Sequence, residues 1–229
     1  MAASALIVGA GSGISAAVAR RLARGGYSVA LAARRPETLA SLAEEIGALA
    51  VACDATIRED VDRLFAELRG RWQQLDVVIY NASYRIGGPL VDLDPADVER
   101  SLAVCAYGGW LVAQQAARWM LRQGSGAILF TGASASVKGY ARSAPFAMGK
   151  FALRGLAQSM ARELSPQNIH VAHFVIDGVV RRSGRSEAAG SADNELDPDA
   201  IAQTYLAILD QPRTAWTGEI ELRPWVERF

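Results

Sequence analysis

A cluster of glycines near the N-terminus has the composition and spacing of a phosphate-binding turn. It directly follows a short apolar run at 4–8, and apolar residues then recur at every fourth position, which predicts an amphipathic helix. Glycines let the backbone approach a pyrophosphate, and the first N–H groups of a helix attract its negative charge. The order of strand, glycine turn and helix therefore favours a nucleotide site over an ordinary strand-to-helix turn, with the binding residues Gly9, Gly11, Ser12, Gly13 and Ile14.

The rest of the chain alternates between short apolar runs and helical patterns. We expect further strands at 27–33, 48–52, 77–80, 127–131, 170–176 and 219–222. Asp94-Pro95 has the residue types that begin a helix, and this helix is expected to run to about Arg122. The alternation predicts an α/β fold with a single domain over 1–229, a Rossmann-type doubly wound parallel sheet of about seven strands flanked by helices. Ligands of such sheets bind beyond the carboxyl ends of the strands.

Composition narrows the class of protein and its partners. The 229 residues have a formal net charge of zero, which argues against a nucleic-acid or anionic-membrane partner. Cys53 and Cys105 are the only cysteines and lack metal-ligand spacing, so we expect no metal site and a reducing compartment. Neither a signal peptide nor a membrane-spanning stretch is recognisable, which predicts a cytoplasmic protein. The polar stretch at 178–196 predicts a mobile substrate loop.

In the order, spacing and length of its elements, the chain resembles the short-chain dehydrogenase/reductase family along nearly its whole length. The turn at Gly9 and Gly13 matches the cofactor turn of this family, with Val8 and Ser15 as departures. The resemblance implies a small-molecule substrate, a dinucleotide cofactor, and assembly as a homodimer or homotetramer.

Two further segments carry the resemblance on the cofactor side. Asp54, just after the third expected strand, matches the residue that binds the adenine, and Ala55 is expected to lie in the same site. The segment 80–83 looks like the Asn-Asn-Ala-Gly motif of the family with two substitutions. The resemblance implies that Asn81 and Ala82 also bind the cofactor.

The residues after the second expected strand indicate which dinucleotide is bound. An Asp at the end of this strand would bind the adenosine ribose and repel a 2′-phosphate, but the matching residue is Ala33. Arg34 and Arg35 follow, and guanidinium groups suit phosphate. A solvated pair at a helix start is the alternative, although a helix N-terminus disfavours cations. The sequence therefore predicts NADP(H) rather than NAD(H).

The resemblance breaks at the catalytic residues. The family works with Asn, Ser, Tyr and Lys, and the matching positions here are Cys105, Ala133, Phe146 and Lys150. Three of the four are replaced, and Phe146 has no proton to exchange. Loss of a general acid or base costs about 10² to 10⁴ in rate, so we do not expect ordinary alcohol–ketone interconversion through a tyrosine. The resemblance implies that Lys150 still binds the nicotinamide ribose.

Other polar residues near the expected nicotinamide site are candidates for the missing acid. Asp177 and Gly178 stand where the family has Pro-Gly, so both are expected beside the cofactor. The Asp177 carboxylate could contact the carboxamide or balance a cationic substrate, or it could simply cap a turn. Ser134 and Tyr140 lie on the loop before the helix that is expected to carry Phe146 and Lys150. Among the tyrosines, Tyr140 is the first candidate for the proton donor.

These observations predict an NADPH-dependent oxidoreductase with a degenerate catalytic tetrad. Its substrate would need no tyrosine relay: a protonated imine, an activated C=C bond, or a carbonyl served by water or another side chain. A non-catalytic NADP-binding sensor or partner protein is the alternative. In a third, weaker hypothesis cofactor binding is lost as well, and Val8 and Ser15 are its first signs.

Overall fold

One parallel sheet organises the molecule. The computed structural model describes residues 2–181 and 194–227, in which seven strands lie in the order β3-β2-β1-β4-β5-β6-β7. All neighbouring strands are parallel, which confirms the expected sheet. The strands are β1 (Ser4–Val8), β2 (Ser28–Ala33), β3 (Leu49–Ala52), β4 (Val77–Tyr80), β5 (Gly126–Thr131), β6 (Ile169–Ile176) and β7 (Glu219–Leu222). The predicted mobile loop at 178–196 lies largely at 182–193, outside the described residues.

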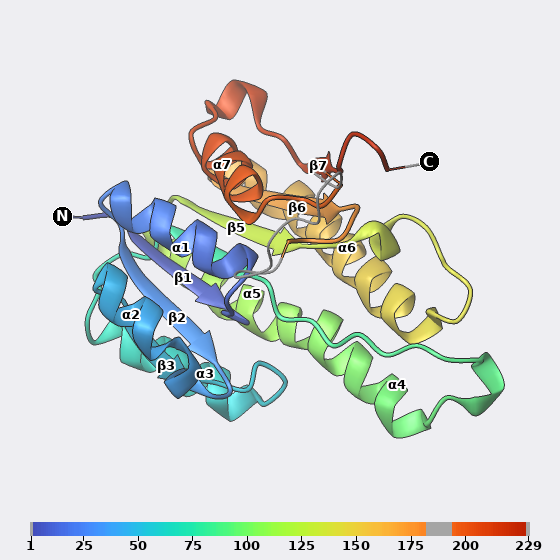
Figure 1. Cartoon of the computed structure of the whole chain (residues 1–229). Coiled ribbons are helices and arrows are strands. Elements are labelled where there is room, and N and C mark those ends of the chain that lie inside the picture. The colour runs from blue at the N-terminus through green and yellow to red at the C-terminus, as the bar shows by residue number, and fades with distance from the viewer. Residues whose placement is uncertain (1, 182–193, 228–229) are drawn as a thin grey trace.

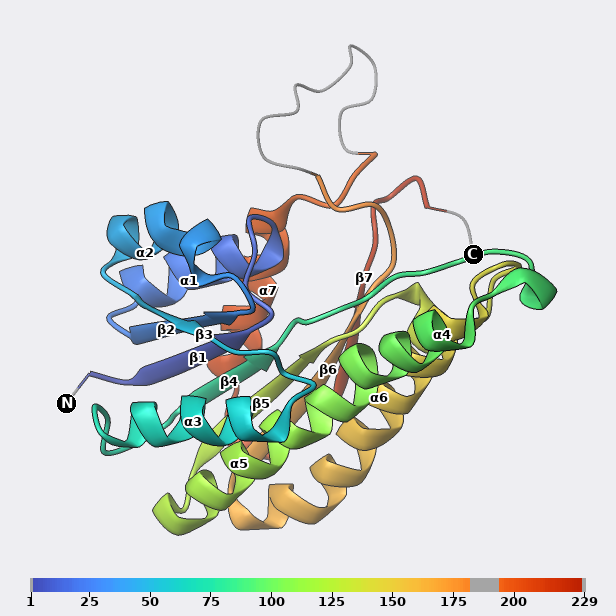
Figure 2. The same cartoon turned by 90° about the horizontal axis from the view of Figure 1, so that it is seen from below.

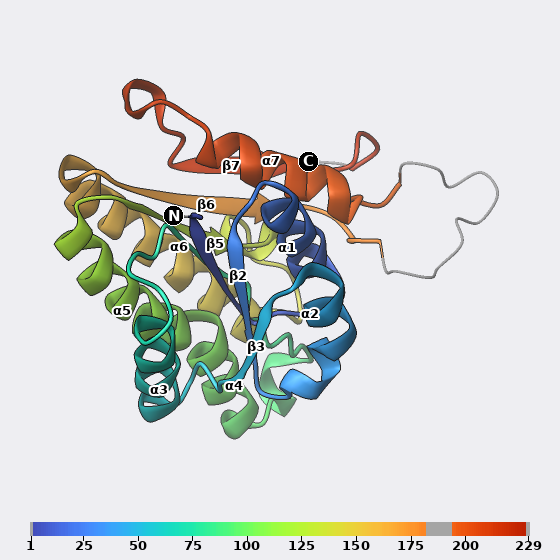
Figure 3. The ribbon, with the colours of Figure 1, turned by 90° about the vertical axis from the view of Figure 1, so that its left-hand side faces the viewer.

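Helices cover both faces of this sheet (Figures 1 and 2). One face carries α1 (Ile14–Arg24), α2 (Ala40–Ile46) and α7 (Pro198–Leu209). The opposite face carries α3 (Arg58–Arg69), α5 (Gly108–Gln123) and α6 (Ala144–Leu164). Figure 3 shows α1 and α2 on one side of β1 and β2, with α3 and α5 on the other. This is the doubly wound arrangement that alternating strands and helices predict.

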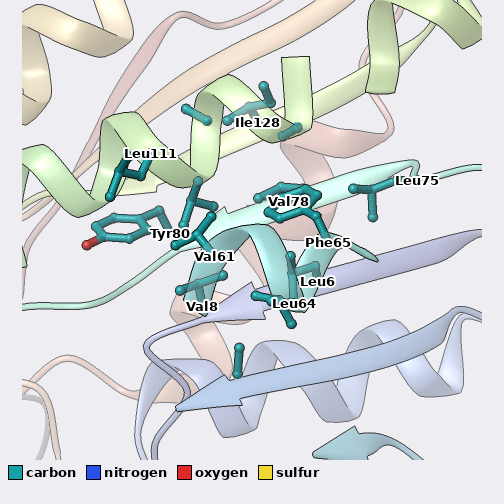
Figure 4. Close-up of a cluster of buried hydrophobic side chains, with 14 of the residues drawn as sticks. Leu6, Val8, Val61, Leu64, Phe65, Leu75, Val78, Tyr80, Leu111 and Ile128 are labelled. Atoms are coloured by element: carbon teal, nitrogen blue, oxygen red, sulfur yellow. The ribbon is translucent and has the colours of Figure 1, made fainter. Parts of the chain in front are cut away.

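The core lies on both sides of the sheet because the central strands are buried on both faces. In β1, Leu6 and Val8 point toward α3, whereas Ala5 and Ile7 belong to the core on the opposite face. Figure 4 shows Leu6 and Val8 among side chains of α3 and β4, including Phe65. Each fully buried side chain of this size contributes about 1.5–3 kcal/mol relative to leaving it exposed.

The chain changes its direction across the sheet between β1 and β4. The strands β2 and β3 lie on one side of β1, and β4 to β7 lie on the other. The loops that begin at Gly9 and Asn81 therefore leave neighbouring strands in different directions. In doubly wound sheets this switch point is where a crevice opens for a ligand.

The long helix expected from Asp94-Pro95 to about Arg122 is interrupted, which corrects that expectation. It consists of α4 (Pro95–Leu102), a π-helical turn at Ala103–Tyr107, and α5. The hydroxyl of the buried Tyr80 donates a 2.6 Å hydrogen bond to the carbonyl oxygen of Val104. A carbonyl group inside a regular helix needs no partner outside that helix, but this turn receives one from β4. No local pattern in the sequence predicts this contact.

Candidate active site

Two adjoining cavities lie beyond the carboxyl ends of the central strands. The outer cavity has a volume of about 310 Å³ and the inner cavity about 300 Å³, and Asn81 and Ser83 line both. Besides Asn81, six residues predicted to bind a cofactor line the outer cavity: Gly9, Arg34, Arg35, Asp54, Ala55 and Ala82. Three more line the inner one: Ile14, Lys150 and Gly178. The fold thus brings most of the predicted site together in one cleft.

In the glycine turn, the packing of the protein itself requires glycine at Gly9, whereas Gly11 and Gly13 face open space. Gly9 has φ +78°, and a Cβ there would lie 2.3 Å from the backbone nitrogen of Ala82. A Cβ at Gly11 or Gly13 would meet no protein atom within 4 Å. The first turn of α1, from Ile14, carries no acidic side chain that would repel an anion. The turn therefore fits a pyrophosphate group at the start of α1.

Ser15, a departure from the family pattern, has a role that the sequence did not reveal. The side-chain amide of Asn81 donates a 2.8 Å hydrogen bond to the Ser15 hydroxyl. Ser15 is buried, and its hydroxyl also lies 3.4 Å from the carbonyl oxygen of Gly9. A glycine at this position could not hold Asn81. The substitution therefore ties the β4 loop to the glycine turn, which argues against decay of the cofactor site.

The far end of the outer cavity carries the arginines and the carboxylate predicted for the adenosine half. Arg34 and Arg35 are exposed, and within the described residues neither forms an ion pair. The Asp54 carboxylate accepts hydrogen bonds from the backbone N–H and the hydroxyl of Thr56, at 3.0 and 2.7 Å. These bonds fix the carboxylate in the cavity wall, and the arginines remain available for a phosphate.

Lys150 is a buried cation with donors to spare. Its side chain is 2% exposed, and Nζ donates a 2.8 Å hydrogen bond to the carbonyl oxygen of Thr131 at the end of β5. No carboxylate in the described part of the chain pairs with it, and burial lowers the pKa of its amino group. An ammonium group has three donors, so two remain for ligand groups such as ribose hydroxyls. Lys150 therefore fits the ribose-binding role that the resemblance implies.

Phe146 and Cys105 lie together but face different surroundings. Phe146 lines the inner cavity, and its ring centroid is 5.8 Å from Nζ of Lys150. Cys105, in the π-helical turn, is fully buried and lines neither cavity. Its thiol lies 3.6 Å from the carbonyl oxygen of Tyr84 and accepts from the N–H of Tyr84 at 3.5 Å. Cys105 therefore holds the loop after β4, whereas Phe146 presents an apolar ring to the cavity.

The loop between β5 and α6 supplies hydroxyl groups but none in the position of the family serine. Ala133, Ser134 and Tyr140 all line the inner cavity, and Tyr140 is 47% exposed. Ser136 is buried, and its hydroxyl accepts a 3.1 Å hydrogen bond from the N–H of Ala133. Ser134 and Tyr140 are thus the predicted proton donors that the structure brings to the cavity wall.

Asp177 lies at the end of β6 but does not line either cavity. Its carboxylate is buried, 3.2 Å from Nζ of Lys138 and 3.5 Å from a guanidinium nitrogen of Arg223. The next residue, Gly178, lines the inner cavity, and a Cβ there would lie 2.6 Å from Cδ of Pro224. The ion pairs give Asp177 a role in anchoring the C-terminal segment, and its predicted contact with a ligand stays a prediction.

Arg85 is a cavity residue that no pattern in the sequence predicts. It follows β4 by a few residues, lines the inner cavity, and places its guanidinium 5.7 Å from the ring centroid of Phe146. A single arginine in a loop gives no periodic or motif signal, so only the folded chain reveals its position.

Neither metal binding nor a membrane span is indicated by the described residues. No group of three or more His, Cys, Asp or Glu side chains among them is arranged to hold a metal ion. None of the helices in ranges 2–181 and 194–227 is long and apolar enough to cross a bilayer.

The fold and cleft together define a Rossmann-type dinucleotide-binding protein. A model of the family described as short chain dehydrogenase matches residues 3–188. The chain belongs to this family of oxidoreductases.

Relatives in this family match almost the whole chain. An uncharacterized oxidoreductase of Staphylococcus aureus strain N315 is 28% identical over 223 residues, or 96% of each chain. A short-chain dehydrogenase structure from Rhodopseudomonas palustris is 34% identical with a TM-score of 0.86, covering 97% of this chain and 99% of that one. An alcohol dehydrogenase structure from Thermococcus sibiricus, complexed with 5-hydroxy-NADP, is 26% identical with a TM-score of 0.88, covering 99% and 98%. The shared architecture therefore extends from the glycine turn to the C-terminal strand.

Proposed function

We propose that this protein is an NADPH-dependent reductase whose substrate does not need a tyrosine as proton donor. The observation that carries the proposal is Lys150, a buried ammonium group with two unused donors on the wall of the inner cavity. A buried lysine without a carboxylate partner is costly for the fold, so a ligand role accounts for it.

The cofactor assignment follows from the two ends of the cleft. Arg34 and Arg35 would bind the 2′-phosphate of NADP, and Asp54 would bind the adenine. The glycine turn and the N-terminus of α1 would hold the pyrophosphate, with Lys150 on the nicotinamide ribose. The related alcohol dehydrogenase that contains 5-hydroxy-NADP supports this choice.

The replaced catalytic residues limit the substrate. When bound, NADPH supplies a hydride, and reduction of a double bond then requires one proton as well. Phe146 presents only carbon to the inner cavity, so the proton must come from the substrate, from water or from a neighbouring hydroxyl. A protonated imine brings its own proton; a carbonyl or activated C=C bond would depend on water, Ser134 or Tyr140. These side chains would orient the substrate and exclude bulk water around it.

Two measurements test the proposal. Calorimetric titration is expected to show tighter binding of NADPH than of NADH, and NADPH absorbance at 340 nm should fall with at least one member of a panel of ketones, cyclic imines and enones. Equal or tighter binding of NADH contradicts the cofactor assignment. Tight binding of NADPH with no consumption on any class contradicts the reductase.

A non-catalytic NADP-binding sensor is the second candidate, because three of the four positions that match the family's catalytic residues carry other residue types, while most residues predicted to bind the cofactor line the cleft. Such a protein would bind NADPH without consuming it, and binding would change its assembly with a partner. Light scattering with and without NADPH distinguishes the two, and it also tests the homodimer or homotetramer that the family resemblance implies.

A further inference from the structure

We propose that Arg85 binds a carboxylate of the substrate, so that the reductase acts on small anionic carbonyl or imine compounds. This inference rests on the proposed function and adds the chemical class of the substrate. It is carried by the position of Arg85 over Phe146 and by the charges around the inner cavity.

Arg85 lies beside Phe146 on the wall of the inner cavity. Its guanidinium is 5.7 Å from the ring centroid of Phe146, and Nζ of Lys150 is 5.8 Å from the same centroid. Phe146, the residue at the position of the family tyrosine, therefore has two cationic groups near its ring. One is the amino group of Lys150, and the other is the guanidinium group of Arg85 from the loop after β4. Contact with the aromatic face restrains the guanidinium group while leaving its N–H donors available.

The charges on the wall of the inner cavity are of one sign. Among the described residues that line it, Arg85 and Lys150 are the charged side chains, and both are cationic. The carboxylate at the end of β6, Asp177, lies outside the wall and is paired with Lys138 and Arg223. Arg85 itself forms no ion pair or hydrogen bond within 2–181 and 194–227. Arg85 is exposed, so water solvates its charge, and only an anionic substrate would replace that water with an ion pair.

The cofactor does not account for Arg85. The predicted phosphate-binding residues are those of the glycine turn and the arginines after β2, and of these Gly9, Arg34 and Arg35 line the outer cavity. Arg85 lines the inner cavity instead, with Ser134, Tyr140 and Phe146. The planar guanidinium fork matches a carboxylate with two parallel hydrogen bonds. A small keto or imino acid is therefore the substrate class that fits the charge of the inner cavity, whose volume of about 300 Å³ also has to hold the nicotinamide.

Matched substrate pairs test the inference. We would compare 4-oxopentanoate with its methyl ester, and 1-pyrroline-2-carboxylate with 2-methyl-1-pyrroline, following NADPH consumption. The carboxylate of at least one pair is expected to have a kcat/KM at least tenfold above that of its neutral partner. Arg85→Ala should lower that kcat/KM about 10- to 100-fold and change the neutral partner less than threefold. Arg85→Lys should be intermediate, because it keeps the charge but loses the planar fork.

The control is Arg118→Ala, which removes an exposed arginine of α5 that lines neither cavity and should leave both substrates unaffected. Equal use of charged and neutral partners, unchanged by Arg85→Ala, overturns the inference while the reductase stands. A clear preference for dihydroxyacetone phosphate over both carboxylates overturns the assignment of a carboxylate.

A binding experiment separates failure of this inference from failure of the proposed function. The NADPH complex is titrated with 4-oxopentanoate in a calorimeter, for wild type and Arg85→Ala. Binding that depends on Arg85 without NADPH consumption supports the anion site and contradicts the reductase. Absence of binding and of turnover for both carboxylates overturns the anion site.

Discussion

The amino group of Lys150 donates a 2.8 Å hydrogen bond to the carbonyl oxygen of Thr131, and this bond joins α6 to the carboxyl end of β5. The contact holds a buried cation at the wall of the inner cavity without a carboxylate partner in the described structure. A charge in this position costs folding free energy, so its removal should affect ligand binding more than stability.

We therefore expect Lys150→Met to lower NADPH affinity about 10- to 100-fold, because donors to the ribose hydroxyls are lost. The free energy of unfolding should stay within about 1 kcal/mol of wild type or rise, since an apolar side chain of similar length replaces a buried charge. Calorimetric titration and urea unfolding measure the two effects. The matched control is Lys138→Met, the only other lysine, which loses its 3.2 Å ion pair with Asp177 but should keep NADPH affinity.

The arginines after β2 should decide between the two dinucleotides. Arg34→Ala combined with Arg35→Ala is expected to weaken NADPH binding about 10- to 100-fold and to leave NADH binding unchanged, because only NADPH carries the 2′-phosphate. Titration of both reduced cofactors checks this. Arg24→Ala, an exposed arginine at the end of α1, is the control. An equal loss for NADH and NADPH would show that the arginines do not read the 2′-phosphate.

Restoring the phenol should restore a proton donor. Phe146→Tyr places a hydroxyl in the inner cavity, and Ala133→Ser adds the hydroxyl of the family serine. The double variant is expected to raise kcat/KM for a neutral ketone by about 10² or more, and Phe146→Tyr alone by less. NADPH consumption measures this, with Phe146→Leu as a control that removes the ring without adding a hydroxyl. Fast ketone reduction by wild type, unchanged in the double variant, would contradict an impaired proton relay.

Stability should fall as the pH decreases, through His173. Burial in β6 lowers the pKa of His173 from 6.5 to about 4 and outweighs the neighbouring Glu219, which lies 3.0 Å away and favours the charged form. The unfolded chain then binds a proton before the folded chain does, so this contribution is complete above pH 6.5 and is lost as the pH falls toward 4.

Between pH 7.5 and 5, wild type should lose about 2 kcal/mol of unfolding free energy from this group, as measured by urea unfolding. His173→Gln should remove most of that pH dependence. His170→Gln tests the other histidine, because burial lowers the pKa of His170 as well. This variant should retain the pH dependence of stability that His173 contributes. A slope that is the same in wild type and His173→Gln would assign the pH dependence to other groups.

Much of the fold follows from local patterns in the chain. The predicted strands end within one residue of the observed ones, because parallel strands buried on both faces are continuous apolar runs such as Val77–Tyr80. The helix from Pro95 was predicted as one element. The π-helical turn interrupts it where Tyr80 is bonded to Val104, and that bond joins residues 24 positions apart.

The sequence by itself determined the family, and it predicted the glycine turn, the arginines after β2, and Phe146 at the position of the family tyrosine, because each depends on residue type and spacing along the chain. The tertiary structure alone decided that Ser15 holds Asn81, that Asp177 pairs with Lys138 and Arg223, and that Arg85 lies over Phe146. These contacts join side chains from loops and elements far apart in the chain. The charged neighbours, the exposure and the bonding partner of each of these side chains depend on how the sheet and its helices bring the loops together. No local pattern in the sequence encodes that arrangement.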